Sequence, residues 1–327
     1  MNDSLLQVRN LRVDFGRQTA LRDVSFDLFP GETVAVVGES GSGKSTLARA
    51  ILRLVHSARG SALFMGMELL KGPASVMRAQ RRNLQIVFQD PLASLNPRMN
   101  AGDAIAEPLK IFEPHLSATE RRQRVAAMLE RVGLSAALAS RYPHEFSGGQ
   151  CQRIGIARAM VLHPKLLICD EPVSSLDVSI QGQIINLLLD LQRDAGMTML
   201  FISHNLAVVR QLSHRVMVMY LGKLVEIASC DLLFAAPVHP YTRALLAAVP
   251  QIPPVPAAAP LVEGSLAAGS TTSGCVFRDR CAYALPLCAS SDPPLTELEA
   301  GRWAACHRSR EALNPLSLQP VTDSQVP

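Results

Sequence analysis

A nine-residue stretch, GESGSGKST at positions 38 to 46, combines glycines, hydroxyl side chains and one lysine. It matches the spacing G-x-x-x-x-G-K-S/T, with Gly38, Gly43, Lys44 and Ser45 at the fixed positions. Glycines let successive backbone N–H groups surround an anion, and a helix that follows presents its positive end. We expect Lys44 to reach the β and γ phosphates of a nucleotide and the Ser45 hydroxyl to bind Mg²⁺. The alternative is an ordinary glycine-rich turn. The expected nucleotide ligands are Gly38, Glu39, Ser40, Gly41, Ser42, Gly43, Lys44, Ser45 and Thr46.

A second candidate is the acidic pair that ends the apolar run LLICDEP at 166 to 172. Asp170 is expected to help hold Mg²⁺, and Glu171 to orient or deprotonate the attacking water. An acidic pair after a strand is usually only the start of a loop. Because it follows a phosphate loop by about 130 residues, hydrolysis of the nucleotide becomes the better interpretation.

A third motif, FSGGQ at 146 to 150, places Ser147, Gly148, Gly149 and Gln150 before a helix. This is a second anion-binding arrangement in a chain that already has one. One nucleotide does not need both. We therefore expect this segment to close over the γ phosphate of ATP held by another chain, so that two chains enclose two nucleotides.

The elements that must position these residues alternate between strands and helices. Strands are expected at 5–15, 21–29 and 33–37, and a helix at 45–55 follows the glycine-rich stretch directly. Strand patterns are missing between about 100 and 162, where a capping box of Ser117 and Glu120 starts a helix, so we expect an inserted helical subdomain at about 91–162. From 165 the alternation resumes, which favours a parallel sheet covered on both faces.

Composition limits the remaining possibilities. The 327 residues are 48% hydrophobic with a formal charge of +4, which is too small to argue for nucleic acid as a partner. No apolar run approaches the roughly 18 residues that a membrane span needs, and the start, MNDSLLQVRN, does not look like a signal peptide. We expect a cytosolic location, two domains at 1–249 and 250–327, and a proline-rich linker after Pro250.

The motifs together resemble the ATP-binding subunits of ABC transporters. The phosphate loop, FSGGQ, LLICDEP, SSLD ending at Asp177 and ISH ending at His204 occur in that family's order. The resemblance implies an ABC-type α/β nucleotide-binding domain, with a P-loop NTPase parallel sheet core, an N-terminal antiparallel β part and an inserted helical subdomain. It also implies that Gln89 senses Mg²⁺ and the membrane partner, that His204 contacts the γ phosphate, and that Phe15 stacks on adenine. Taken singly, Phe15 could be a core strand residue, and Gln89 and His204 ordinary polar residues.

The nearer resemblance is to the oligopeptide and dipeptide importer branch, through VFQDPLASLNPR, YPHEFSGGQ and HPYTRALLAAVP. Two departures stand out. Cys151 replaces an arginine of the signature helix, which puts its usual contact across the interface in doubt, and SHN at 203–205 replaces the commoner SHD.

The C-terminal tail carries Cys275, Cys281, Cys288 and Cys306, spaced C-x5-C-x6-C-x17-C. In a reducing compartment this grouping indicates a metal. The spacing argues against zinc, because the cysteine pairs that bind structural zinc usually lie two to four residues apart. The importer resemblance implies a 4Fe-4S cluster in some members, held by the four cysteines; zinc and unliganded thiols stay as alternatives.

The resemblance also implies partners: a second, related ATPase subunit in a heterodimer, two transmembrane permease subunits and a solute-binding protein. The chain itself would lie peripherally on the cytoplasmic face of the inner membrane. Three functions remain open: the ATPase of a peptide importer, the same role for nickel, glutathione or another small solute, and a soluble ABC protein of DNA repair or translation. We expect no nucleic acid partner, since neither coiled coils nor tandem nucleotide domains are evident.

Overall fold

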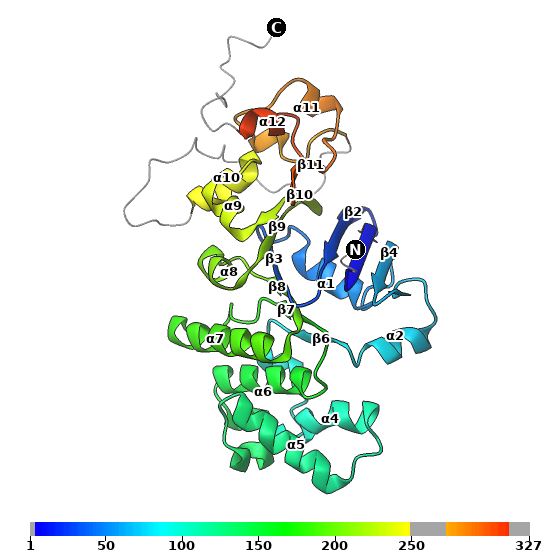
Figure 1. Ribbon diagram of the computed structural model, residues 1–327, viewed down its shortest axis with the longest axis vertical. Helices are drawn as coiled ribbons and strands as arrows, with labels where there is room; N and C mark the ends of the chain where they lie inside the picture. Colours follow the sequence, from blue (N-terminus) through cyan, green and yellow to red (C-terminus); the bar gives the residue numbers. More distant parts are fainter. Residues whose placement is uncertain (1–3, 249–272, 314–327) are drawn as a thin grey trace. The chain divides into compact units, whose positions relative to one another are not determined.

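The computed structural model describes residues 4–248 and 273–313. Within these residues the chain forms two compact units, most of whose helices and strands are labelled in Figure 1. Unit 1 contains residues 4–7, 27–33 and 63–203, and unit 2 contains 8–26, 34–62 and the described residues from 204 onward. The predicted linker after Pro250 lies outside the described residues, so the domain boundary at 249 stays a prediction.

Unit 1 is built on three parallel strands, β6 (Leu84–Val87), β7 (Leu166–Asp170) and β8 (Thr198–Ile202). Leu166 of β7 pairs with Leu84 on one side and with Thr198 on the other. Every residue of β7 and β8 is buried. Burial on both faces is what a parallel sheet covered by helices requires, and it explains why these strands read as continuous apolar runs.

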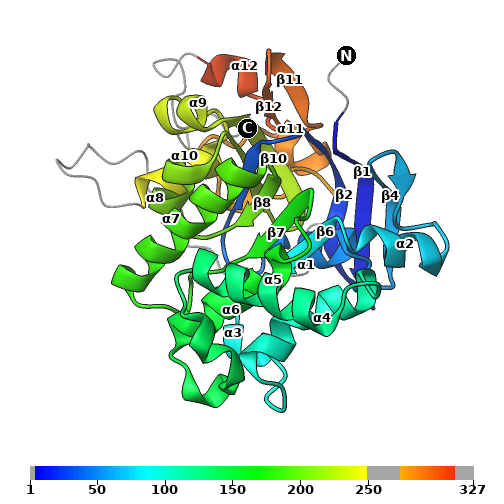
Figure 2. The ribbon, with the colours of Figure 1, turned by 60° about the horizontal axis from the view of Figure 1, so that its bottom comes forward.

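The remaining elements of unit 1 are mostly helical. In chain order they are β5 (Met67–Glu68), α2 (Ala74–Gln80), α3 (Pro91–Ser94), α4 (Ala101–Phe112), α5 (Ala118–Arg131), η1 (Ala136–Ser140), η2 (Pro143–Glu145), α6 (Gly148–Met160) and α7 (Val178–Ala195). Helices α4, α5 and α6 pack on one another (Figure 2). The predicted capping box at the start of α5 is present: the Glu120 N–H donates to Ser117 Oγ, and the Ser117 N–H donates to the Glu120 carboxylate.

Unit 2 combines two sheets. In one, β3 (Thr33–Val37) runs parallel to β9 (Arg215–Tyr220), which pairs antiparallel with β10 (Lys223–Ser229); β10 pairs with β12 (Arg302–Ala304), and β12 with β11 (Thr296–Glu299). The other has the order β2 (Gln18–Leu28), β1 (Leu6–Phe15), β4 (Ala58–Phe64), most of whose residues belong to unit 2. The helices are α1 (Lys44–Ile51), α8 (Leu206–Leu212), α9 (Cys230–Ala235), α10 (Pro240–Ala247), η3 (Arg278–Arg280), α11 (Leu287–Ser290) and α12 (Ser309–Ala312). The predicted ABC-type mixture of parallel and antiparallel β structure with inserted helices is confirmed.

Two predicted boundaries are wrong. The strand expected at 21–29 begins earlier, at Gln18. The helix expected to run to Val55 ends at Ile51. Arg53 has a φ of +52°, and the Leu54 N–H donates to the Arg49 carbonyl over 2.8 Å. A residue in the left-handed region at this position ends a helix with a Schellman motif, and glycine usually fills it. Because arginine fills it here, the sequence shows no stop signal.

The residues from 273 to 313, which we call the C-terminal extension, share a core with the rest of unit 2. Cys275, Phe277 and Cys288 belong to the same buried cluster as Val218 of β9 and Tyr241 of α10. The extension also adds strand β12 to the edge of β10, where Glu226 pairs with Ala304. Its position within unit 2 is therefore fixed by both apolar packing and a strand ladder.

Candidate nucleotide site

The phosphate loop lies in unit 2, between β3 and α1, as the sequence predicts. Two of its glycines are sterically required. A Cβ at Gly38 would stand 2.2 Å from the Met219 carbonyl oxygen, and one at Gly43 would stand 2.7 Å from the Ala20 carbonyl oxygen. Gly43 also has a φ of +103°, which side-chain-bearing residues rarely adopt. The loop therefore passes so close to neighbouring backbone that only glycine fits at these two positions.

Lys44 is the first residue of α1 and is buried. Its ammonium group donates to the carbonyl oxygens of Gly38 at 2.8 Å and of Glu39 at 2.9 Å. The side chain thus lies along the inside of the loop that it follows. A cation held there by two neutral carbonyls can exchange these contacts for phosphate oxygens, which form stronger, charge-assisted hydrogen bonds.

Glu39 makes contacts that sequence reasoning missed. Its backbone N–H donates to the Tyr241 hydroxyl over 2.8 Å, and its carboxylate accepts two hydrogen bonds from Arg280. Tyr241 lies in the segment HPYTRALL, which was noted only as a family resemblance, and Arg280 lies in the C-terminal extension, 241 residues further along the chain. No local pattern could have revealed the pairing with Arg280, although the HPY motif did mark Tyr241.

The other predicted residues of unit 2 lie at the ends of elements. Phe15 ends β1 and is 52% exposed, so it is not a core residue but an exposed ring, as a stacking platform requires. His204 is exposed and precedes Asn205, which caps α8 by accepting hydrogen bonds from the N–H groups of Ala207 and Val208. Asparagine and aspartate are equally good caps, so SHN in place of SHD preserves the local structure.

In unit 1, Asp170 ends β7 and Glu171 follows it. Asp170 is buried, and Glu171 has a φ of +48°. A residue other than glycine in this region costs about 1–3 kcal/mol and is found mostly at functional sites. The Gln89 side-chain amide donates to a Glu171 carboxylate oxygen over 3.3 Å. The structure therefore places Gln89, a residue implied by the family resemblance, against Glu171 of the acidic pair.

The signature segment begins α6. Ser147 caps the helix: its Oγ accepts from the Gln150 N–H at 3.4 Å, and Gln150 Oε1 accepts from the Ser147 N–H at 3.0 Å. A Cβ at Gly149 would stand 2.7 Å from a methyl group of Ile180 on α7, so glycine permits the close approach of the two helices. Ser147 and Gly148 are exposed at this positive helix end. The first N–H groups of α6, at the positive end of the helix, therefore lie at the surface of unit 1.

Two further positions noted in the sequence, Asp177 and Cys151, also lie in unit 1. Asp177 is exposed at the N-cap position of α7. Cys151 is fully buried, and its thiol lies 3.5 Å from the Pro143 carbonyl oxygen. Burial raises the pKa of Cys151. The thiol therefore faces the interior of unit 1 and not solvent.

The four tail cysteines gather in the C-terminal extension. The Cys275 N–H donates to the Cys288 carbonyl at 2.8 Å. Burial, with smaller contributions from the other three thiols, raises the pKa of Cys281 to about 12. Burial likewise raises the pKa of Cys306 to about 11. Within residues 4–248 and 273–313, however, no three His, Cys, Asp or Glu side chains are arranged to hold a metal ion. The thiols are neighbours, but they do not form a site for a single ion such as zinc.

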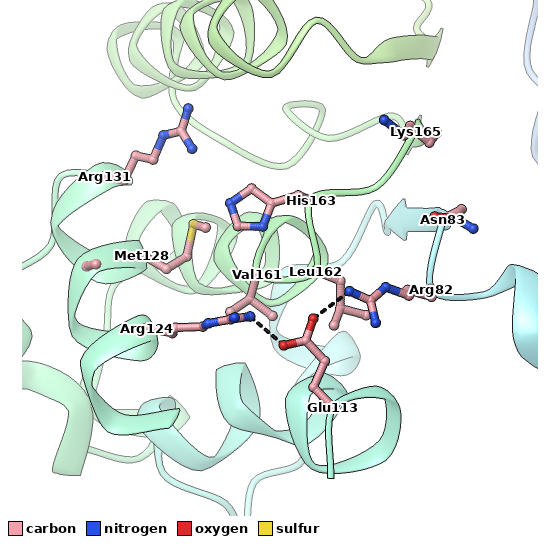
Figure 3. Close-up of a pocket in the computed structure, with 11 residues that line it drawn as sticks. Arg82, Asn83, Glu113, Arg124, Met128, Arg131, Val161, Leu162, His163 and Lys165 are labelled. Carbon is pink, nitrogen blue, oxygen red and sulfur yellow. Dashed lines mark hydrogen bonds and ion pairs between the residues drawn. The ribbon is translucent and has the colours of Figure 1, made fainter. Parts of the chain in front are cut away.

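Unit 1 also contains a basic pocket of about 580 Å³ (Figure 3). Its lining comprises Arg82, Asn83, Glu113, Arg124, Ala127, Met128, Arg131, Val161, Leu162, His163 and Lys165. The buried Glu113 carboxylate lies between Arg82 and Arg124 and pairs with both. These pairs join the end of α4 to α5 and to the start of β6. None of the predicted nucleotide-site residues lines this pocket.

Comparisons with known proteins agree with this geometry. Residues 21–174 match the family model described as ABC transporter, and residues 225–288 match the one described as oligopeptide/dipeptide transporter, C-terminal region. The chain belongs to the ABC transporter family. It is 54% identical over 291 residues to the oligopeptide transport ATP-binding protein OppF of Haemophilus influenzae, covering 88% of each chain. It is 52% identical over 308 residues to OppF of Escherichia coli, covering 89% of this chain and 92% of that one.

A solved structure extends the comparison to geometry. The ATP-binding cassette MJ0796, determined as a dimer in a post-hydrolysis state bound to ADP and Pi, superposes with a TM-score of 0.63 at 28% identity, covering 69% of this chain and 98% of that one. As a member of this family the chain is an ABC-type ATPase. The C-terminal match ends at Cys288, so it does not include Cys306. Among the described helices, none has both the length and the apolar character that crossing a bilayer demands.

Proposed function

We propose that the chain is the ATP-hydrolysing subunit of an importer for dipeptides and oligopeptides. The observation that carries this conclusion is the identity of more than half of the aligned residues to proteins named oligopeptide transport ATP-binding protein, over nearly nine tenths of both chains. The match of residues 225–288 to the C-terminal region of such transporters supports the same cargo class.

In unit 2, we assign the phosphate loop to the triphosphate. Lys44 binds the β and γ phosphates, the loop N–H groups and the N-terminus of α1 surround them, and Phe15 stacks on the adenine ring. The Ser45 hydroxyl is an oxygen donor of the kind that Mg²⁺ prefers. His204 contacts the γ phosphate. The steric requirement for glycine at positions 38 and 43 supports this assignment, because it shows that the loop is held tightly against neighbouring backbone.

In unit 1, we assign Glu171 as the group that orients or deprotonates the attacking water. Its contact with the Gln89 amide supports this role, because that amide fixes the carboxylate while leaving its own oxygen to face a cation. Asp170 and Gln89 are further oxygen donors of the kind that Mg²⁺ prefers, and this ion neutralises phosphate charge during transfer. We also assign to Gln89 the role of reporting the state of the site to a membrane partner.

Two such chains enclose two nucleotides. Ser147, Gly148, Gly149 and Gln150 of one chain cap the γ phosphate held by the other, and Asp177 lies at the same interface. The exposed, positive start of α6 supports this role, as does the likeness to a cassette solved as a dimer with ADP and Pi. We expect a heterodimer with a related ATPase, two permease subunits and a solute-binding protein, at the cytoplasmic face of the inner membrane. ATP closes the dimer and hydrolysis opens it, which moves the permeases between two states.

The test is to co-purify the chain with its permease and ATPase partners and to measure ATP hydrolysis with cargo-loaded solute-binding protein. Peptide-loaded binding protein should stimulate hydrolysis severalfold, and the same complex carrying Lys44→Ala in this chain should show the loss of that stimulation. Stimulation by nickel or glutathione but not by peptides would refute the cargo assignment. A chain that neither binds ATP nor joins permeases would refute the transport function itself.

We also propose a 4Fe-4S cluster on Cys275, Cys281, Cys288 and Cys306. Their location in one folded extension supports a common site: the Cys275 N–H donates to the Cys288 carbonyl, and all four side chains are buried or half-buried. Each thiolate of such a cluster binds a different iron, so the sulfurs need not converge as they do around one ion. The chain purified without oxygen should contain iron and acid-labile sulfide; Cys306→Ser should lose both, whereas Cys151→Ser should keep them. Zinc or no metal would remove the proposal.

A further inference from the structure

Glu39 is the one acidic residue of the phosphate loop, and the C-terminal extension holds it. Arg280 Nη1 donates to Glu39 Oε2 over 2.9 Å, and Nη2 donates to Oε1 over 3.1 Å. The pair is therefore bidentate, the geometry in which an arginine and a carboxylate interact most strongly. The Arg280 side chain is 12% exposed and that of Glu39 26%, so water screens the pair only partly.

The Arg280 side chain is itself fixed by aromatic rings. Its guanidinium lies over the Tyr220 ring, 5.9 Å from the centroid. Phe277, three residues earlier, meets the Tyr220 ring edge-on at 5.2 Å and also contacts Tyr241 at 5.5 Å. Tyr241 in turn accepts the Glu39 N–H through its hydroxyl. The same aromatic cluster thus supports both contacts to Glu39, one to its side chain and one to its backbone.

These contacts matter for the charge around a bound nucleotide. The Glu39 carbonyl oxygen accepts a hydrogen bond from Lys44, so Glu39 lies next to the ammonium group that we assign to the phosphates. An unpaired carboxylate at this position would repel a polyphosphate. Pairing with Arg280 neutralises the Glu39 carboxylate and holds the Glu39 side chain away from the inside of the loop. The same contacts order the loop before ATP binds, so less conformational entropy is lost on binding.

We propose that Arg280 is a positioning residue for ATP binding, through which the C-terminal extension sets the affinity of the phosphate loop for ATP. This inference rests on the proposed function only in that the loop binds ATP. Arg280 acts through Glu39, so its loss weakens binding and leaves the chemical step unchanged.

The test measures the affinity of the full-length chain for the Mg²⁺ complex of a non-hydrolysable ATP analogue, by calorimetry. Arg280→Gln should weaken binding about tenfold, the size expected when one partner of a partly buried ion pair is removed. Arg280→Lys keeps the charge but not the bidentate geometry, and should weaken it about threefold. Arg310→Gln is the matched control, because it removes the same charge from an exposed position of the same extension. In hydrolysis assays the effect of Arg280→Gln should appear in KM rather than in kcat.

A double-mutant cycle separates this role from a general loosening of the extension. In a Glu39→Gln background, Arg280→Gln should weaken binding less than about threefold, because no carboxylate is left unpaired. An equal loss in both backgrounds, or no loss in either, would overturn the proposal. If Arg280→Gln does not fold, Arg280→Lys decides by the same comparison. Failure of the wild-type chain to bind the analogue would instead contradict the proposed function.

Discussion

His239 provides the most quantitative prediction, because it is buried as a neutral base. It is 1% exposed and is the N-cap residue of α10, where its Nδ1 accepts the Tyr241 N–H over 3.0 Å. Its ring also hydrogen-bonds to the backbone of Ala305 in the C-terminal extension. Burial lowers the pKa of His239 from 6.5 to about 3. Protonating Nδ1 would remove the acceptor that caps the helix.

The lowered pKa makes folding stability depend on pH in a defined direction. The unfolded chain binds a proton at His239 below pH 6.5, whereas the folded chain does not until about pH 3, so stability falls as the pH falls through this window. At pH 5 the difference is about 1.5 pH units, and at about 1.4 kcal/mol per unit the loss is about 2 kcal/mol. This corresponds to an apparent Tm lower by roughly 4–8 °C than at pH 7.5.

The assay compares thermal unfolding of the wild-type chain and of His239→Asn between pH 7.5 and pH 5. Asparagine can still cap α10 but does not titrate. The variant loses packing at every pH, so only the pH dependence of the difference between the two proteins counts. We expect the wild-type Tm to fall roughly 4–8 °C further than that of the variant. Parallel curves would refute the idea that His239 is held neutral.

Three further predictions address the nucleotide site. Glu171→Gln should keep ATP binding, slow hydrolysis at least about 100-fold and accumulate closed dimers with Mg-ATP, measured by phosphate release and size-exclusion chromatography; unchanged turnover would remove Glu171 from the role of base. Lys44→Ala should weaken ATP binding more than about tenfold by calorimetry, because it removes charge-assisted contacts to phosphate; an unaltered Kd would exclude Lys44 as a phosphate ligand. Gly43→Ala should lower both Tm and ATP affinity, since its Cβ would stand 2.7 Å from the Ala20 carbonyl oxygen; Gly41→Ala, whose Cβ would meet no atom within 4 Å, tests how much of the loss comes from a positive φ alone.

The sequence predicted most of the elements because local patterns and tertiary burial agree in this fold. The segment TVAVV forms β3 with the expected bounds, since five buried residues rich in branched side chains suit a central strand. The face of α5 formed by Val125, Met128 and Leu129 is buried as its spacing predicts. The end of α1 was missed because the left-handed residue is an arginine and carries no recognisable signal.

For the candidate site, motifs identified the residues of each unit but not the contacts that hold them. Gln89 and Glu171 are 82 residues apart, and Glu39 and Arg280 are 241 apart. A contact between such distant positions depends on the completed fold, and a single arginine among many does not stand out by spacing. The cysteine pattern similarly indicated a common location without predicting that β11 and β12 would lie between Cys288 and Cys306.

The shared core of unit 2 has a consequence for how this subunit can be shortened. A version of the chain stopped at residue 248 would leave the rings of Tyr220 and Tyr241 facing water where Phe277 now packs, and the β10 edge would offer unpaired N–H and C=O groups. Such a fragment would be prone to aggregation as well as less stable. The C-terminal extension is thus a structural part of unit 2 and cannot be removed without exposing the core of that unit.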